Sequence, residues 1–178
     1  MNRKLIIPFI LLMFYSCKNA PHEVILSQVQ ELYGRNIVFT HNDHYVLNGR
    51  DTIIKQTNDY KIVMYSDSLG CQECELKLGD WRLKIKELKL LGKAVDFIFI
   101  IQSSDYSSFE HMASENLPDF PFIYDKEGKF FKQNKLPSDK RYNTFLLDKD
   151  NRIILVGNPT NGDKIWELYK TQIPQKDE

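Results

Sequence analysis

The sequence predicts an α/β fold built around one mixed β-sheet, and two patterns carry that prediction. In the middle of the chain, a buried-strand pattern at Tyr60–Ser66 is followed by an apolar stripe at helical spacing and by a second apolar run at 95–102. Near the end, two apolar runs at 142–148 and 153–157 are separated only by a turn at 149–151. Strand-helix-strand connections require parallel neighbours, whereas strand-turn-strand connections require antiparallel ones. One sheet must therefore contain both.

Helices are predicted where apolar residues recur every three or four positions. Three such stripes consist of Leu78, Trp81, Ile85 and Leu88; of Phe109, Met112, Ala113 and Leu117; and of Ile165, Leu168, Tyr169 and Ile173. The first helix is expected to begin at Cys71 or Cys74, and Pro118 stops the second. The segment 120–125 then reads as a third buried strand, with a turn at 127–128. Trp81 and Trp166 lie on helical apolar stripes, so we expect both in the core.

The region before Tyr60 predicts a helix and a small β-meander added to the main domain. Apolar residues at helical spacing run from Ile25 to Leu32, and Gly34 ends the pattern. The short apolar runs 36–39, 45–47 and 51–54 follow, with Asn48-Gly49 suited to the two-residue turn of a hairpin. We therefore expect three segments: a leader at 1–16, an N-terminal extension at 17–59 and a main domain at 60–178.

The first residues have the order of a secretion signal. Arg3 and Lys4 precede an apolar run from Leu5 to Tyr15, which is much shorter than the roughly 20 residues needed to span a bilayer. The stretch FYSC resembles the processing box of bacterial lipoproteins, which implies cleavage before Cys17 and lipid on that cysteine. An ordinary secretory signal that leaves Cys17 as a free thiol is the alternative. Either reading places the chain in the cell envelope or beyond.

Charge and cysteine content exclude several classes of function. The chain has 24 basic and 24 acidic residues, so no basic excess points to nucleic acid. Its 3 cysteines are too few for a disulfide scaffold. With Cys17 assigned to lipid, one pair remains, Cys71 and Cys74.

A Cys-x-x-Cys pair at the first strand-to-helix junction, with a parallel unit followed by an antiparallel one, resembles the thioredoxin superfamily. The extra helix and strand at 107–125 and the segment TFLLDKDNRII are similar to the branch with membrane-anchored thiol-disulfide reductases and peroxiredoxins. The resemblance runs from about Tyr60 to Ile173 and implies a thioredoxin-like mixed sheet flanked by helices. A helix start favours a thiolate at Cys71, and Cys74 lies close enough to resolve a mixed disulfide.

The residues around the pair predict its redox poise. A carboxylate about 7 Å from Cys71, such as that of Glu73 or Glu75, opposes the thiolate by roughly 1 kcal/mol at an effective dielectric near 40. This matches the roughly 0.3–1 kcal/mol that a helix terminus contributes, so we expect a reducing pair. Asp67 is a candidate proton relay, with a polar loop residue as the competing interpretation. Tyr65 stands where some relatives carry a polar residue that assists proton transfer.

Two departures from the resemblance concern the substrate groove and peroxidase activity. The cis-proline of thioredoxin-like oxidoreductases falls at Tyr142 or Asn143 here, and we expect a trans bond and an altered groove because a cis bond without proline costs about 2.5–4 kcal/mol. Peroxiredoxins need a proline and a threonine where this chain has Met64 and Ser68, which argues against peroxidase activity.

The resulting hypothesis is an exported thiol-disulfide oxidoreductase that needs no cofactor and exchanges disulfides with another protein, with an electron-donor protein in the envelope. Lys18 after the lipid cysteine favours the outer membrane where a cell has one. One alternative is a non-catalytic, thioredoxin-like lipoprotein that acts as a binding module. The other is a zinc site built from the cysteine pair with His41 and His44, although their spacing is tighter than in structural zinc motifs.

Overall fold

The computed structural model describes residues 21–39, 45–47, 49–53, 56–67 and 76–175. Two compact units divide the chain, residues 1–31 and 32–178. Helix α1 (Pro21–Leu32) confirms the predicted N-terminal helix, and its residues 21–31 are the described part of the first unit. Gly34 has a φ of 78°. No described helix is long and apolar enough to cross a membrane.

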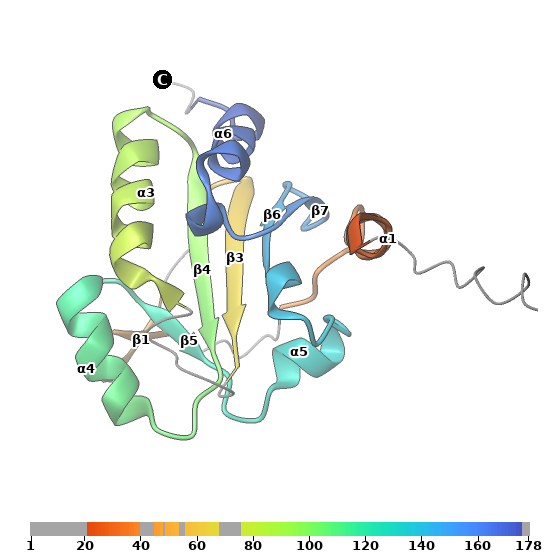
Figure 1. Cartoon of the computed structure of the whole chain (residues 1–178). Coiled ribbons are helices and arrows are strands. Elements are labelled where there is room, and N and C mark those ends of the chain that lie inside the picture. Colours follow the sequence, from red (N-terminus) through yellow and green to blue (C-terminus); the bar gives the residue numbers. More distant parts are fainter. Residues whose placement is uncertain (1–20, 40–44, 48, 54–55, 68–75, 176–178) are drawn as a thin grey trace, which may run out of the picture. The chain divides into compact units, whose positions relative to one another are not determined.

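The second unit is built on a seven-stranded mixed sheet with the order β2-β1-β5-β4-β3-β6-β7 (Figure 1). Its strands are β1 (Tyr45–Leu47), β2 (Arg50–Thr52), β3 (Tyr60–Ser66), β4 (Val95–Ile101), β5 (Phe122–Tyr124), β6 (Thr144–Leu147) and β7 (Ile153–Val156). β3, β4 and β5 are parallel, whereas β6 and β7 are antiparallel to their neighbours. The mixed sheet predicted from the sequence is confirmed.

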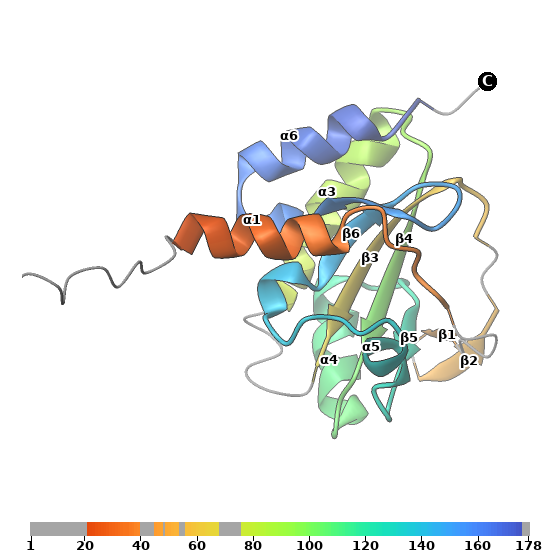
Figure 2. The ribbon, with the colours of Figure 1, turned by 90° about the vertical axis from the view of Figure 1, so that its right-hand side faces the viewer.

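The predicted hairpin at Asn48-Gly49 is also confirmed as β1 and β2. β1 pairs antiparallel with β5, so the hairpin extends the edge of the main sheet (Figure 2). The run 36–39 does not form a strand, because only Asn36 makes an isolated bridge, with Arg152. The division of the chain at residues 59 and 60 stays a prediction.

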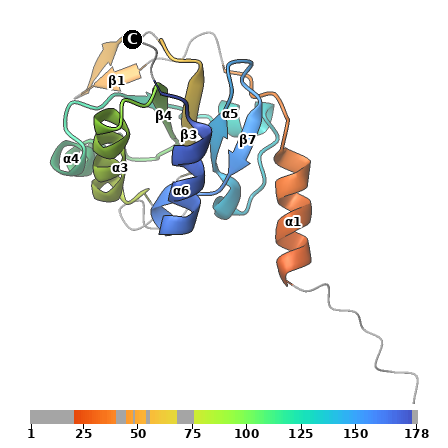
Figure 3. The same ribbon diagram turned by 90° about the horizontal axis from the view of Figure 1, so that it is seen from above.

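Helices cover both faces of the sheet (Figure 3). One face carries α3 (Leu78–Leu90), α4 (Tyr106–Asn116) and α6 (Asp163–Gln172), and the other carries the short α5 (Lys129–Gln133). Helix α5 was not expected from the sequence. Its five residues are too few for a helical period to be recognised, and its first backbone N–H groups depend on the side chain of Asp125, which accepts from Lys129 N and Phe130 N.

Helix α3 begins later than predicted. Lys77 has a φ of 47° and a ψ of 46°, a left-handed conformation that no α-helix can include. A single helix running from Cys71 or Cys74 to Leu88 is therefore wrong, although the apolar stripe from Leu78 onwards packs on the sheet as expected.

The main core lies between the sheet and the three helices α3, α4 and α6. Trp81 is fully buried, with its ring 5.0 Å from that of Phe99, which in turn lies 4.9 Å from Phe120. Trp166 is buried as predicted, and its Nε1 donates to Glu87 at 2.8 Å. Leu168, which the sequence placed on the apolar stripe of α6, is 49% exposed, so that assignment is wrong.

Candidate functional site

The carboxyl end of β3 opens into a small pocket of about 50 Å³. Its lining comes from three parts of the chain: the end of β3, the position just before α3, and the segments around β6 and after β7. The lining residues are Met64, Tyr65, Ser66, Asp67, Leu76, Lys140, Asn143, Thr144 and Asn158. Asp67 and Leu76 are the described residues on either side of residues 68–75, which hold Cys71 and Cys74 and lie outside the described residues. We call this the β3 pocket.

Strand pairing brings the other side of the β3 pocket into place. Met64 faces Thr144 in the antiparallel pair of β3 and β6, and Tyr65 N donates to Asn143 O at 2.9 Å. The turn η1 (Lys140–Tyr142) therefore ends beside the last residues of β3. Thr144 O accepts from Gly157 N at 2.8 Å, which places the next residue, Asn158, on the same wall.

An ion pair crosses the β3 pocket. Lys140 Nζ lies 3.1 Å from Asp67 Oδ1, and the Asp67 side chain is 19% exposed. The candidate relay residue thus binds a cation that lies 73 positions further along the chain. Lys140 was not among the residues singled out in the sequence. The signal that could have found it is its position in KRYN, directly before the predicted groove residues.

The two residues at the predicted cis-proline position behave differently. No peptide bond in the described ranges is cis, so the expected trans bonds at Tyr142 and Asn143 are present. Asn143 is 3% exposed and lines the β3 pocket, and its Oδ1 has no hydrogen-bond partner among the described residues. Tyr142 does not line the pocket; its Oη is buried without a described partner, and Arg141 lies 5.6 Å from its ring.

Tyr65 supplies no acidic group to the pocket. The strand continues one residue past it, to Ser66. The Tyr65 Oη donates to Gln102 Oε1 at 2.6 Å, and its ring lies 5.6 Å from that of Phe131 on the face covered by α5. Burial, with the charge of Asp125 next in size, raises the pKa of the Tyr65 hydroxyl, so it stays protonated.

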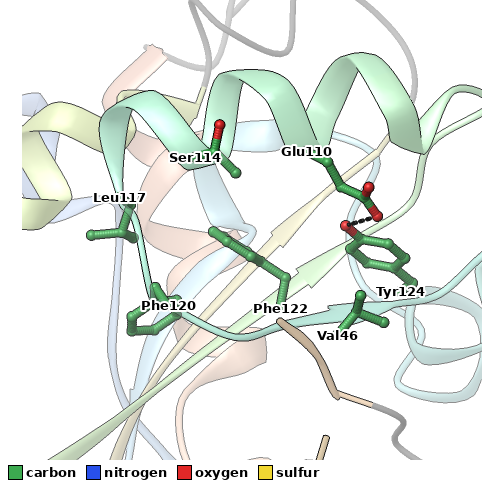
Figure 4. Close-up of a pocket in the computed structure, with 8 residues that line it drawn as sticks. Val46, Glu110, Ser114, Leu117, Phe120, Phe122 and Tyr124 are labelled. Carbon is green, nitrogen blue, oxygen red and sulfur yellow. Dashed lines mark hydrogen bonds between the residues drawn. The ribbon is translucent and has the colours of Figure 1, made fainter. Parts of the chain in front are cut away.

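A second cavity lies between α4, β5 and β1 (Figure 4). It measures about 20 Å³, room for about one water molecule, and its walls are mostly apolar. Glu110 Oε1 accepts from Tyr124 Oη at 3.0 Å, and burial together with this bond raises the pKa of the tyrosine hydroxyl (Figure 4). The size of the cavity and the paired polar groups indicate packing between α4 and the sheet rather than a ligand site.

The described residues contain no group of three or more His, Cys, Asp or Glu side chains that could hold a metal ion. Cys71, Cys74, His41 and His44, on which the zinc alternative depends, lie outside the described residues, as does Cys17. His111, on α4, lies 3.8 Å from Glu115 and is highly exposed.

Comparison with known proteins gives matches in structure alone. No protein-family model matches the chain. No curated protein matches it in sequence. A thioredoxin-like protein from Bacteroides caccae matches with a TM-score of 0.55 and 21% identity, over 84% of this chain and 53% of that one. AhpC from Enterococcus faecalis matches with a TM-score of 0.54 and 15% identity, over 79% and 92%. The thioredoxin domain of a thiol-disulfide oxidoreductase from Bacteroides vulgatus matches with a TM-score of 0.52 and 11% identity, over 66% and 81%.

The chain has the thioredoxin-like fold. This agrees with the observed strand order, in which parallel β4 and antiparallel β6 flank β3, and with helices on both faces. The chain spans about half the length of the Bacteroides caccae protein. In this thioredoxin-like fold the β3 pocket lies at the carboxyl end of parallel strands, the edge at which open α/β sheets bind ligands.

Proposed function

We propose that this chain is an exported thiol-disulfide oxidoreductase that works at the β3 pocket through Cys71 and Cys74. The observation that carries the proposal is that Asp67 and Leu76, which flank the cysteine segment, line one pocket together with Lys140 and Asn143. Cys71 is four residues from Asp67 and Cys74 is two residues from Leu76. At roughly 3.3–3.6 Å per residue, the chain keeps Cys71 within about 14 Å of Asp67. It keeps Cys74 within about 7 Å of Leu76.

The proposed chemistry is a two-step exchange. The Cys71 thiolate attacks one sulfur of a partner disulfide; the partner S–S bond breaks, and the released partner thiolate takes up a proton. Cys74 then loses its proton and attacks Cys71 in the mixed disulfide, which releases the second partner thiol. The partner is reduced by two electrons and the Cys71–Cys74 pair is oxidised. A protein dithiol of the envelope would return the pair to its reduced form.

The charges around the pocket bear on the poise of this pair. Lys140 is a cation on the pocket wall, and a nearby cation favours a thiolate. Asp67 holds Lys140 at 3.1 Å and offsets part of its charge, and Glu73 and Glu75 in the cysteine segment also oppose the thiolate. We therefore expect a reductase rather than a strong oxidant.

The deciding experiment is the reduction potential of the pair in a Cys17→Ser variant, from thiol alkylation across glutathione and dithiothreitol buffers. A reversible couple between about −270 and −200 mV supports disulfide exchange. A Cys71→Ser variant should trap no partner, whereas Cys74→Ser should accumulate mixed disulfides with Cys71. A pair that never cycles, with a potential below about −300 mV or no oxidation at all, would overturn the proposal.

A binding module without catalysis is the second candidate, and the trans bonds at Tyr142 and Asn143 favour it. Loss of the cis-proline geometry alters the wall on which a partner chain would lie. In this case the chain would bind its partner equally well after both cysteines are changed to serine. Partner binding that disappears in the double variant would exclude the module.

The proposed location is the cell envelope, with the chain anchored through lipid on Cys17. The basic Arg3 and Lys4, the apolar run and Cys17 in FYSC support it. The intact mass of the protein purified from a bacterial membrane fraction tests it. We expect a chain that begins at Cys17 and carries acyl chains, and a Cys17→Ser variant that is released from the membrane.

A further inference from the structure

The outer face of α3 combines exposed leucines with basic side chains. Leu83 is 64% exposed and Leu90 is 79% exposed, and Arg82, Lys86 and Lys89 are exposed beside them. At 100° per residue these five side chains fall within one third of the helix circumference. We call this set the α3 face.

The three cations of the α3 face have no charged partner among the described residues. Other basic side chains of the same layer are engaged: Lys170 Nζ lies 2.8 Å from Glu87 Oε1, and Lys93 Nζ donates to Ile173 O at 2.8 Å. The carboxylate of Glu87 is therefore already committed to Lys170 and to Trp166. The charge of the α3 face remains uncompensated by this layer.

The neighbouring helices show that this charge is local. α3 has four basic and two acidic residues, whereas α4 has two glutamates and no lysine or arginine, and α6 is balanced. The whole chain has equal numbers of basic and acidic residues. Figure 3 shows α3 between α4 and α6 on one side of the sheet, so its outer side is not covered by another described helix of that layer.

We propose that the α3 face docks on an anionic lipid surface. Leu83 and Leu90 are two turns apart, about 10.5 Å along the axis, so both can enter one flat surface. Binding of a helix to a membrane surface increases with the apolar area that it buries there and with the attraction of its cations to anionic lipids. Each cation near an anionic surface strengthens binding about fivefold, so three give on the order of a hundredfold. The proposal does not rest on the thiol chemistry of Cys71 and Cys74.

The test is lysine acetylation of the full chain, mixed with vesicles of phosphatidylcholine alone or with phosphatidylglycerol added, followed by mass spectrometry. We expect acetylation of Lys86 and Lys89 to fall about fivefold or more only with the anionic lipid, and to recover at 1 M salt because of screening. Lys129 on α5, whose side chain is 66% exposed, is the internal reference and should not change.

Paired variants separate the α3 face from other surfaces. Leu83→Asn with Leu90→Asn should remove most of the protection of Lys86 and Lys89. Leu168→Asn changes an exposed leucine on α6 and should leave the protection intact. Equal acetylation in both kinds of vesicle would overturn the proposal. Protection of Lys86 and Lys89 in detergent without lipid would also overturn it, because a second protein copy would then cover the face. A Cys71→Ser/Cys74→Ser variant should give the same footprint, so failure of the redox proposal leaves this result readable.

Discussion

Asn134, after α5, and Asn143, beside the β3 pocket, are both buried, at 4% and 3% exposure, but their side chains differ in what they bind. Asn134 Oδ1 accepts from Val38 N at 2.8 Å, and its Nδ2 donates to Val38 O and to Phe130 O. Its amide thus pairs with both backbone groups of Val38, as a neighbouring strand would, and holds the segment before the hairpin in place. Asn143 lines the pocket, and its Oδ1 has no described partner.

The difference is between a region whose buried polar side chain is fully hydrogen-bonded and one in which a buried acceptor has no described partner. A buried polar atom with full hydrogen bonding contributes to stability, whereas one without a partner lowers it. Around Asn134 every amide atom is used, and the guanidinium of Arg35 also donates to Asn134 O. At the β3 pocket the Oδ1 of Asn143 is buried and has no partner among the described residues.

The largest expected effect is on the stability of the Asn134 region. Asn134→Ala removes three hydrogen bonds and leaves both backbone groups of Val38 unpaired, so we expect a loss of about 2–3 kcal/mol in the free energy of unfolding. Urea denaturation measures it. Asn36→Ala, which removes one exposed bond to Asp150 O, is the control and should cost less than about 1 kcal/mol. Equal losses of unfolding free energy in Asn134→Ala and Asn36→Ala would show that the three bonds of Asn134 stabilise the fold no more than one exposed bond.

The second prediction concerns Asn143. Asn143→Ala should leave the free energy of unfolding within about 0.5 kcal/mol of the original, because the atom that it removes has no partner to lose. If a partner chain uses this acceptor, kcat/KM for disulfide exchange should fall about tenfold, the worth of one hydrogen bond. A large loss of stability with unchanged exchange would reverse the roles assigned to the two asparagines.

The third prediction tests the ion pair of the β3 pocket with two variants of opposite sign. Lys140→Met removes a cation, so it should raise the pKa of the Cys71 thiol and slow its alkylation at pH 7 about two- to fivefold. Asp67→Asn removes the opposing anion and should lower that pKa and speed alkylation. The pH dependence of iodoacetamide alkylation measures both. Shifts in the same direction would show that the pair acts through structure rather than charge.

The smallest expected effect involves Glu87, a polar group that is satisfied but half-exposed. Hydrogen bonds from Lys170 and Trp166 lower the pKa of its carboxyl. A lowered pKa means that the folded state prefers the charged form, so this stabilisation is present above the unfolded pKa of about 4.3 and is lost as the pH falls through the folded value. Glu87→Gln should therefore cost less than about 1 kcal/mol at pH 7, after allowance for solvent screening.

Denaturation as a function of pH provides the check on Glu87. The difference between Glu87→Gln and the original chain should disappear in acid, where Glu87 is protonated in both states. Glu167, which also lies near Lys170 at 2.7 Å but is more exposed, serves as the matched position. A Glu167→Gln cost as large as that of Glu87→Gln would show that the bond from Trp166 contributes nothing.

The sequence alone determined the type and order of most elements. Four consecutive apolar residues within Tyr60–Ser66, the helical spacing through Trp81, and the turn at 149–151 are local patterns, and each constrains only a few neighbouring residues. Local patterns also predicted the hairpin at Asn48-Gly49, and the lengths of the connections predicted the parallel and antiparallel parts of the sheet. It also placed the cysteine pair next to the end of the first core strand.

Only the tertiary structure decided which distant residues meet. The edge at which the hairpin pairs, the contact of Lys140 with Asp67, and the unused acceptor of Asn143 depend on segments separated by tens of residues. The left-handed Lys77 interrupts an apolar pattern that would otherwise continue as one helix, and the short α5 depends on the side-chain cap from Asp125, so neither follows from local propensity. Hydrophobic periodicity specifies what a segment buries. Long-range polar contacts carry no period, so the ion pair of Asp67 with Lys140 could not be read from the sequence, although Asp67 and Asn143 were singled out there.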